Sequence, residues 1–495
     1  MGRDIDATAF TAEDRARYRD KVKADLAALA QLVAQGRLRS GGAQMGLEME
    51  LYLVDDAGAA APRNADLLER LPGGAVQTEL AKFNAEIDLV PRALSANVLA
   101  SAEDSLSAAL AKVRAAAAEL GIGVVEIGIL PTLTHDDLTL EHISANPRYR
   151  ALNDAIVAAR GEHLSIRIEG SETLATTASS ILFEAACTSL QLHLAVEPHD
   201  FARFWNAAQA ASAPLVAAAA NSPLFLGRRL YHETRLPLFT QAIDTRPEEL
   251  SRQGVRPRVW FGERWISEGM FELFDENVRY FPALLPLCFE EDPLAVLAIG
   301  KVPELPELAL HNGTVYRWNR PVYAVVGDTP TVRIENRVLP AGPTPVDAIA
   351  NAAFFYGLVR SLADADPPVW RHLSFDSAAA NLEAAARDGL GATLAWPGAG
   401  PSTPVATLIS DLLLPAARAG LARWGIDPGD ADRYLGIIAD RVASGRNGAA
   451  WQLAELDTLT DGPVDAAASA ALLARYRACA ETGAPVHTWP LSGAG

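Results

Sequence analysis

Alternation of apolar and polar residues marks the first clear strand of the chain. In GLEMELYLVD, residues 46–55, every second position is apolar, so Glu48 and Glu50 fall together on the other face. A rise of about 3.3 Å per residue puts the two carboxylates roughly 6–7 Å apart. Two such anions side by side either face solvent or share a positively charged partner.

Three later segments alternate in the same way. They are FNAEIDLVP (83–91), TSLQLHLAV (188–196) and TVRIENRV (331–338). Their polar faces carry Glu86, Asp88, Gln191, His193, Glu335 and Arg337. Further strands are predicted at residues 123–130, 163–170, 313–318 and 322–326. These dispersed strands predict a mostly antiparallel sheet.

Helical segments surround these strands and dominate the last third of the chain. Helices are predicted at residues 12–36, 101–121, 147–160 and 200–219, the second of them beginning at Ser101 and ending at Gly121. From Pro345 onward they are predicted at 345–365, 376–389, 403–424, 430–444 and 464–482. The pattern predicts an α+β protein with an N-terminal helical segment (1–45), a catalytic body (46–360) and a helical C-terminal region (361–495) packed on it.

Composition and charge limit the classes of partner that the protein is expected to bind. The 495 residues are 49% apolar and 21% charged, which is ordinary for a globular protein. A net charge of −18 disfavours binding to nucleic acid or to an anionic membrane. The three cysteines show no disulfide or zinc spacing, and the polar N-terminus lacks a signal peptide. Since no apolar run reaches about 18 residues, we expect a cytoplasmic protein without a membrane span.

The candidate chemistry lies on the polar strand faces. Neither GxxxxGK[ST] nor a well-placed GxGxxG occurs, so the sequence shows no phosphate-binding loop. Taken singly, two acids on a strand more often face solvent, and a lone histidine more often makes a structural hydrogen bond. Acids that converge on one concave sheet would instead repel each other unless divalent cations lay among them, and such oxygen-rich sites suit Mg²⁺ or Mn²⁺.

Six motifs, in this order, resemble the glutamate–cysteine ligase and carboxylate–amine ligase family, which has the glutamine-synthetase-like fold. They are GLEMELYLVD, ELAKFNAEIDLVP, TSLQLHLAV, ANSPLFLGRRLYHETR, HNGTVYRWNRP and TVRIENRVLPAGPTPVD, and they span residues 46 to about 360. The resemblance implies a curved, mostly antiparallel sheet that forms a funnel-shaped active site. Its inner face would bind ATP at one end and an amino-acid carboxylate at the other, with Mg²⁺ ions between them.

The resemblance also implies roles for individual residues. The expected metal ligands are Glu48, Glu50, Glu79, Glu86, His193 and Glu335. Arg337 would meet phosphate oxygens, and Arg235 would bind the substrate acid. Thr314 and Arg320 are candidates for the nucleotide site, although packing is the commoner role for such strand residues. Gln191 is a candidate for substrate binding because it shares a strand face with His193.

The activity implied by the resemblance is ATP-dependent amide formation through an acyl phosphate. Glutamate, through its γ-carboxylate, is the expected acid and cysteine the first candidate amine, a reaction of glutathione biosynthesis. Another acid and amine in specialised biosynthesis, or a non-catalytic sensor of amino acids or nucleotides, are the alternatives. The first motif has two acids where many relatives have three, so a third metal contact is absent or supplied elsewhere. Arg148 is either a substrate contact or part of a helix surface, and the oligomeric state is left open.

Overall fold

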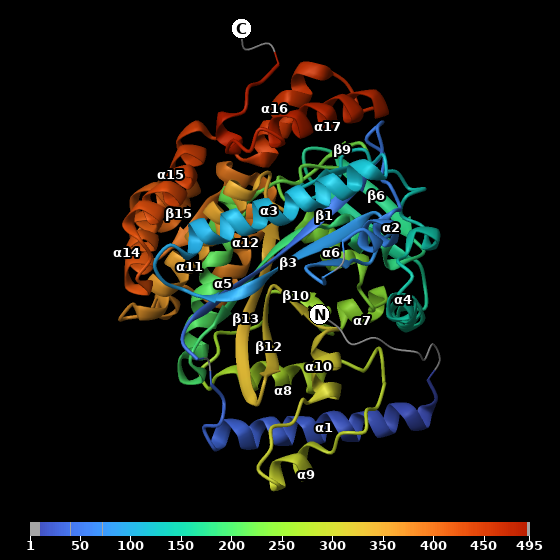
Figure 1. The fold of residues 1–495 in the computed structure, drawn as a ribbon, viewed down its shortest axis with the longest axis vertical. Helices are drawn as coiled ribbons and strands as arrows, with labels where there is room; N and C mark the ends of the chain where they lie inside the picture. Colours follow the sequence, from blue (N-terminus) through green and yellow to red (C-terminus); the bar gives the residue numbers. More distant parts are fainter. Residues whose placement is uncertain (1–9, 40, 72, 493–495) are drawn as a thin grey trace.

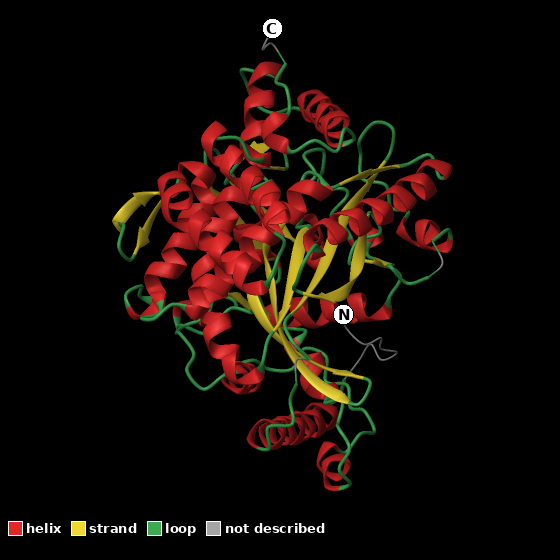
Figure 2. Cartoon of the chain, turned by 60° about the vertical axis from the view of Figure 1, so that its left-hand side comes forward, coloured by secondary structure: helices red, strands yellow, loops and turns green. Residues whose placement is uncertain are grey.

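The computed structural model describes residues 10–39, 41–71 and 73–492. A curled sheet runs through the middle of the molecule, helices cover one of its faces, and the last helices of the chain gather at one end (Figures 1 and 2). The predicted α+β class, with a curved antiparallel sheet and a helical C-terminal region, is confirmed.

The main sheet has seven strands in the order β12-β13-β7-β1-β3-β2, with β4 beside the end of β1. Their bounds are β1 (Gln44–Val54), β2 (Val76–Thr78), β3 (Asn84–Ala93), β4 (Gly123–Val125), β7 (Ser189–Ala195), β12 (Asn319–Val326) and β13 (Thr329–Pro340). Every neighbouring pair is antiparallel. Strands far apart in the sequence therefore meet in one surface, with β1 near its centre.

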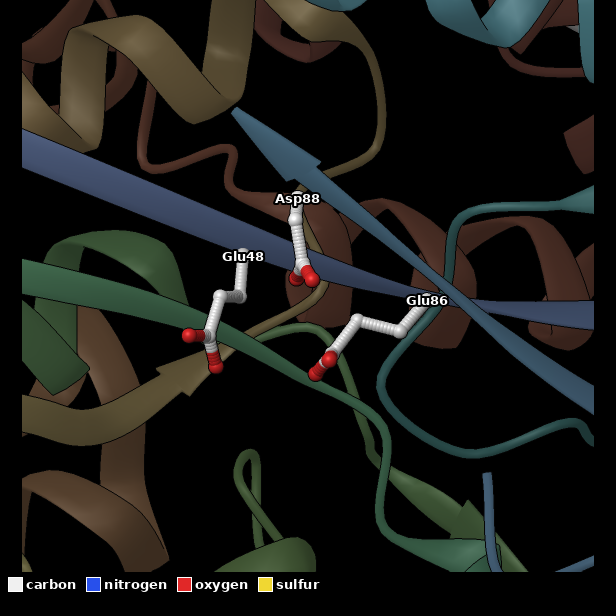
Figure 3. A group of neighbouring side chains, drawn as sticks. All are labelled: Glu48, Glu86 and Asp88. Atoms are coloured by element: carbon white, nitrogen blue, oxygen red, sulfur yellow. The ribbon is translucent and has the colours of Figure 1, made fainter. Parts of the chain in front are cut away.

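The register of β1 brings acidic residues from two strands together. Glu48 lies opposite Asp88 of β3 on one side and opposite Gln191 of β7 on the other, while Glu50 lies opposite Glu86. Residues directly opposite in a sheet point to the same face. The side chains of Glu48, Glu86 and Asp88 accordingly reach toward one another from β1 and β3 (Figure 3).

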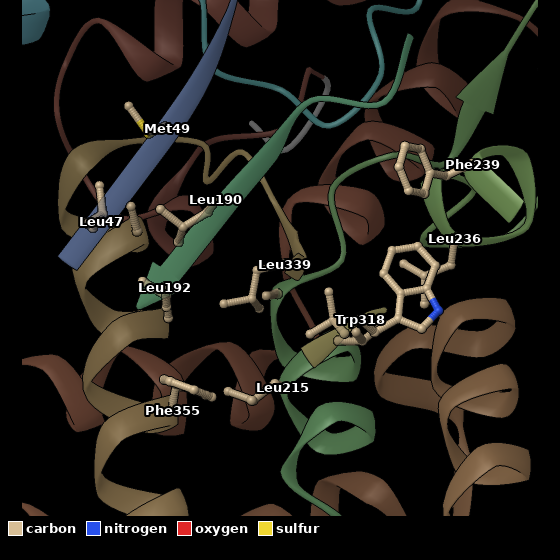
Figure 4. Close-up of a cluster of buried hydrophobic side chains, with 14 of the residues drawn as sticks. Leu47, Met49, Leu190, Leu192, Leu215, Leu236, Phe239, Trp318, Leu339 and Phe355 are labelled. Atoms are coloured by element: carbon tan, nitrogen blue, oxygen red, sulfur yellow. The ribbon is translucent and has the colours of Figure 1, made fainter. Parts of the chain in front are cut away.

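The opposite face of the sheet is covered by helices α5 (Phe201–Ala219) and α11 (Pro345–Asp364). Leucines of β1 and β7 form an apolar cluster with residues of these helices (Figure 4). The labelled members on these four elements are Leu47, Met49, Leu190, Leu192, Leu215 and Phe355. The Tyr356 hydroxyl of α11 donates to the carbonyl oxygens of Gly46 and His193, which ties the helix to both strands. The apolar half of each alternating strand thus forms the core.

The remaining helices pack around this layer. In the first half of the chain they are α1 (Ala12–Ala34), α2 (Asn64–Glu69), α3 (Val98–Glu119), α4 (Pro147–Arg160), α6 (Arg235–Ala242) and α7 (Glu248–Arg252). Next come α8 (Met270–Tyr280), α9 (Pro293–Ala298) and α10 (Pro306–Asn312), which pack against α1. The C-terminal helices are α12 (Phe375–Asp388), α13 (Val405–Leu408), α14 (Leu414–Trp424), α15 (Pro428–Ser444), α16 (Gly448–Leu459) and α17 (Ala466–Ala480). Since α14 and α15 pack against α11, the C-terminal region lies on the body of the protein.

Four small two-stranded sheets complete the structure. They are β5 (Leu164–Glu169) with β6 (Thr173–Ala178), β8 (Leu224–Phe225) with β9 (Arg228–Arg229), β10 (Val259–Trp260) with β11 (Tyr316–Arg317), and β14 (Thr393–Trp396) with β15 (Gly400–Pro404). The pair β10–β11 is parallel. The strand predicted at 313–318 is therefore much shorter than expected and lies outside the main sheet.

Other boundaries also differ from those predicted. The strand expected at 123–130 ends at Val125, because Gly128 leaves the β1 ladder and bonds instead to Asn221 and Thr188 through its backbone. Helix α3 begins at Val98, so Ser101 lies inside it rather than at its start. Helix α16 was not predicted, since its apolar pattern is short.

One helical stretch in the described part of the chain is long and apolar enough to cross a membrane. It is Val405–Trp424, with 20 residues, a mean hydropathy of 1.4 and 39% of its most apolar window buried. Core helices of water-soluble proteins pass the same test, and this stretch packs against α11, so it is weak support for a membrane span. The expected cytoplasmic location stays a prediction.

Candidate active site

A cavity of about 480 Å³ lies over the polar face of the sheet. Five glutamates and four arginines line it: Glu48, Glu50, Glu79, Glu86, Glu184, Arg148, Arg235, Arg320 and Arg337. The aromatic side chains of Tyr149, Phe239, Tyr316 and Trp318 contribute to its wall. The cavity therefore combines acids and arginines of the sheet with further charged groups and aromatic rings from the segments that face it.

Two groups of three carboxylates converge in this region. One group is Glu48, Glu86 and Asp88, and the other is Glu50, Glu79 and Glu86; within each, one oxygen per residue lies within 4.8 Å of the others. Glu86 belongs to both groups, so it links them. Sets of oxygen ligands at this spacing suit Mg²⁺ and Mn²⁺. The structure thus brings together the four glutamates of β1 and of the 79–86 segment.

Protonation of these acids reflects their burial and crowding. Burial, with the charges of Glu50 and Glu184 added, raises the pKa of Glu79 to about 8. Burial and the neighbouring carboxylates raise the pKa of Glu86 well above its usual value. Burial likewise raises the pKa of Asp88, and the charge of Glu48 adds to this. Without a cation, the group cannot be fully ionised at neutral pH, because like charges in a buried site oppose one another.

Polar contacts from β7 fix the position of Glu50. The Ser189 backbone N–H and hydroxyl donate to its two carboxylate oxygens over 2.8 and 2.9 Å. The Gln191 amide donates to Glu50 over 3.1 Å and to Glu86 over 3.3 Å. Gln191 also lines the cavity, but its amide nitrogen is directed at the acids. Its role as a substrate contact stays a prediction.

His193 touches the acidic group through Glu48. Its Nε2 lies 2.9 Å from Glu48 Oε1, and its Nδ1 accepts from Arg333 Nε over 3.0 Å. Burial opposes ionisation of Glu48, but the neighbouring His193 brings the pKa of that carboxyl down to about 2. His193 lies outside both carboxylate groups, and its role as a metal ligand stays a prediction.

Glu335 is held by two arginines. Arg320 of β12 and Arg337 of β13 each donate to one of its carboxylate oxygens over 2.8 Å. Burial opposes ionisation, but the two guanidinium groups lower the pKa of Glu335 well below its usual value. This carboxylate lies outside the two acidic groups and aligns the arginines along the cavity wall. The role of Glu335 as a metal ligand stays a prediction.

Sequence comparison identifies the family of this site. The profile of glutamate–cysteine ligase family 2 matches residues 44–470, most of the chain. The chain belongs to glutamate–cysteine ligase family 2. The family that the motifs resemble is thereby confirmed, and with it the broad ATP-dependent, carboxylate–amine ligase-like class. No curated protein matches the sequence significantly.

Two solved structures are similar to this family 2 member. The glutamate–cysteine ligase of Francisella tularensis, solved with AMP, is 12% identical with a TM-score of 0.50, and the match covers 91% of this chain and 96% of that one. A bifunctional glutathione synthetase of Pasteurella multocida is 13% identical with a TM-score of 0.49, and the match covers 92% of this chain and 55% of that one. The likeness to the Francisella enzyme supports the fold described above.

In this family 2 member, Arg235 lines the cavity and also bonds to backbone carbonyl oxygens and to Glu233. It begins α6, and its two Nη atoms donate to the carbonyl oxygens of Arg337, Val338 and Leu339 over 3.0 to 3.3 Å. The ladder between β13 and β7 changes register between Asn336 and Leu339. Such bulges re-aim side chains beside active sites. Arg235 thus holds the bulge that carries Arg337, and its expected role as the substrate-carboxylate ligand stays a prediction.

Thr314 lies away from the cavity. Its hydroxyl donates to the His311 carbonyl oxygen over 2.9 Å, and the nearby Arg258 donates to its backbone oxygen. Thr314 is buried and absent from the cavity lining, whereas Arg320 lines it. Of the two nucleotide-site candidates, only Arg320 is therefore placed where it could meet a ligand. The packing alternative describes Thr314 better.

Three residues of the site were not assigned a role there from the sequence. Asp88 alternates onto the polar face of β3, and the structure places it opposite Glu48. It could therefore replace the third acid that many relatives have in the first motif. Arg148 was left open between a substrate contact and a helix surface. Glu184 lies in a short 3₁₀ helix, Ile181–Ala186, where no alternation signals which way a side chain points. Only the folded chain places Arg148 and Glu184 in the cavity.

Proposed function

We propose that this chain is an ATP- and Mg²⁺-dependent ligase that joins a carboxylate of glutamate, the γ-carboxylate first, to an amine. Cysteine is the first amine to test. The observation that carries this proposal is the convergence of two carboxylate groups with Arg320 and Arg337 in one cavity. Membership of glutamate–cysteine ligase family 2 supports the reaction class. The AMP in the Francisella structure supports a nucleotide substrate.

The acidic groups fit divalent cations. They offer only carboxylate oxygens, the donors that Mg²⁺ and Mn²⁺ prefer. Asp88 Oδ1 is buried and has no hydrogen-bond partner within the described residues, so one ligand atom is available. The proposed ligands are Glu48, Glu50, Glu79, Glu86 and Asp88. When bound there, Mg²⁺ would neutralise phosphate oxygens and help to position ATP.

The residues of the chain supply the remaining requirements of phosphoryl transfer. Arg337 and Arg320, aligned by Glu335, present cationic guanidinium groups to the phosphate oxygens. In the first step, a glutamate carboxylate oxygen attacks the γ-phosphorus of ATP and ADP leaves. In the second step, the amine nitrogen attacks the acyl carbon. A C–N bond forms, the C–O bond to phosphate breaks, phosphate leaves, and the amine proton passes to solvent. Tyr149, Phe239 and Trp318 in the cavity wall would limit the access of water to the acyl phosphate.

Two other functions of the same site remain to be tested. The first is a ligase for a different acid and amine, in specialised biosynthesis. The second is a non-catalytic relative that binds an amino acid or a nucleotide. The set of mutually repelling buried acids favours catalysis, because a site without metal chemistry would gain stability by losing them.

Turnover with defined substrates separates these functions. The protein is incubated with ATP, Mg²⁺, L-glutamate and a panel of amines, and ADP and phosphate are measured. Release that requires both glutamate and cysteine supports the proposal, and release with another pair supports the alternative ligase. Glu169→Gln, in an exposed strand, serves as the control and Glu86→Gln as the inactive variant. Binding of ATP without turnover for any pair would contradict both ligase functions.

A further inference from the structure

Two ionisable side chains, one basic and one acidic, line the part of the cavity that faces the sheet. Arg148 is in the first turn of α4, and Glu184 is in the 3₁₀ helix Ile181–Ala186. These two helices pack against each other, and both side chains line the cavity. They therefore offer a guanidinium group and a carboxyl group to the same cavity, apart from the two carboxylate groups on the sheet.

Neither side chain is satisfied by the protein. In residues 10–39, 41–71 and 73–492, no hydrogen bond or ion pair meets the carboxylate of Glu184 or the guanidinium of Arg148, and Arg148 Nε is buried without an acceptor. The other cavity arginines differ: Arg320 and Arg337 bind Glu335, and Arg235 binds backbone carbonyl oxygens. Both residues are partly buried, and charged groups withdrawn from water without a partner are unfavourable, so a pair of this kind indicates a ligand.

The charges of Arg148 and Glu184 both act on one neighbouring ring, that of Tyr316. Burial raises the pKa of Tyr316, the charge of Glu184 adds to this, and the charge of Arg148 opposes it. Burial also raises the pKa of Glu184 to about 8, an effect that a bound cation would reverse. Tyr316 itself lines the cavity. A small ligand beside this ring would meet both charges.

We propose that Arg148 and Glu184 bind the zwitterionic head of an amino acid, its carboxylate on the guanidinium and its ammonium on the carboxylate. Arginine matches a carboxylate with two parallel hydrogen bonds, and a carboxylate accepts from an ammonium. This inference rests on the proposed ligase function and names a subsite for it. Both glutamate and an amino-acid amine such as cysteine carry this chemistry, and the experiment distinguishes the two sources.

The test measures KM separately for each substrate in Glu184→Gln and Arg148→Gln. Each variant should raise the KM of one amino acid by about 10-fold or more, because a charge-assisted hydrogen bond is lost. The KM for ATP should change by less than about twofold, since the contacts to the nucleotide are untouched. Arg167→Gln and Glu169→Gln, an exposed ion pair on β5, are the matched controls. The melting temperature of Arg148→Gln should match the wild type, since its guanidinium has no structural partner within the described residues. That of Glu184→Gln should match or exceed the wild type, because glutamine removes the cost of ionising a buried carboxyl group.

Hydroxylamine in place of the amine identifies which amino acid is bound. It is uncharged at neutral pH and has no carboxylate, so it does not need the subsite. If the KM for glutamate still rises, the pair binds glutamate; if hydroxylamine restores normal kinetics, the pair binds the second substrate. Unchanged KM values for both amino acids would overturn the inference. If the wild type shows no turnover, the ligase proposal is refuted. Calorimetric binding of glutamate and cysteine then tests the subsite separately. Binding that the variants lose supports the subsite, and any other result overturns it.

Discussion

Glu50 of β1 lies directly opposite Glu86 of β3, and the two residues are only 9% and 5% exposed. Like charges in this position destabilise a sheet. Hydrogen bonds from Ser189 and Gln191 hold the pair in place, and the charges of Arg337 and Arg235 act on Glu50 as well. Such an arrangement is expected where a divalent ion is the missing partner.

Replacing Glu86 tests this directly, since Glu86 belongs to both carboxylate groups. We expect Glu86→Gln to reduce Mn²⁺ affinity and turnover by at least about 100-fold, because a ligand common to both groups is lost. The metal-free variant should melt at a higher temperature than the wild type at pH 8, because one repelling charge is gone. Paramagnetic resonance of Mn²⁺ and thermal melting measure the two effects. Equal Mn²⁺ affinity in variant and wild type would exclude Glu86 as a ligand.

The stability of the metal-free protein should depend on pH. The pKa of Glu79 rises from 4.5 to about 8 on folding, and that of Glu184 does the same. The folded state therefore keeps protons that the unfolded state has lost, so the stability they contribute is complete below about pH 4.5 and is lost as the pH rises through 8. When the pKa of a group differs by about one between the folded and unfolded states, the unfolding free energy changes by about 1.4 kcal/mol. Urea denaturation between pH 5 and 8.5 measures the slope.

Mg²⁺ should make the unfolding free energy depend less steeply on pH. A bound cation stabilises the ionised form of Glu79, so the loss of stability toward pH 8 should become smaller as Mg²⁺ is added. Glu184 lies outside the carboxylate groups, so Glu184→Gln should retain the Mg²⁺ effect. A stability profile that Mg²⁺ leaves unchanged between pH 5 and 8.5 would argue against a metal site at Glu79.

Arg235 should act through Arg337. In Arg235→Lys the ammonium cannot bond to the carbonyl oxygens of residues 337, 338 and 339 together, so the bulge in β13 should loosen. We expect a fall in kcat of about 10–100-fold and an unchanged KM for glutamate. Arg337→Lys, measured beside it, should reduce kcat by about 100–1000-fold. A large rise in the KM for glutamate in Arg235→Lys would restore its role as a substrate ligand.

Glu335 should be more important for stability than a metal ligand would be. Glu335→Ala leaves two largely buried guanidinium groups without their shared anion, which should cost about 3–5 kcal/mol of unfolding free energy. Glu335→Gln keeps the shape and should lose less stability, yet it should lower turnover because Arg320 and Arg337 are no longer aligned. Mn²⁺ affinity should be nearly normal in Glu335→Gln, and a strong loss of affinity would show that Glu335 is a ligand after all.

Replacing Thr314 and replacing Arg320 should have different effects on the KM for ATP. Thr314→Val removes a hydroxyl that bonds to the His311 carbonyl oxygen, so it should cost about 1 kcal/mol of stability and leave the KM for ATP unchanged. Arg320→Gln removes a cation from the cavity wall and should raise the KM for ATP. Kinetics at saturating glutamate and amine distinguish the two. An equal rise in KM for both variants would return Thr314 to the nucleotide site.

Local patterns predicted much of what the structure shows. Alternation placed Glu48 and Glu50 on one face of β1 and Glu86 on one face of β3, and side-chain direction in a strand follows from backbone geometry alone. The ends of strands and helices were predicted less well where hydrogen bonds to distant segments determine them. Residues 126–130 look like a strand but leave the sheet, because Gly128 finds other backbone partners.

The sequence by itself determined the family, the fold class and the strand faces, because periodicity and ordered motifs are properties of neighbouring residues. Only the tertiary structure decided which charges meet. It placed Asp88 opposite Glu48, turned Arg235 toward backbone carbonyl oxygens, enclosed Glu335 between two arginines and brought Arg148 and Glu184 into the cavity without a partner among the described residues. Those relationships depend on the register of strands and the packing of helices that are far apart in the chain, which no local pattern encodes.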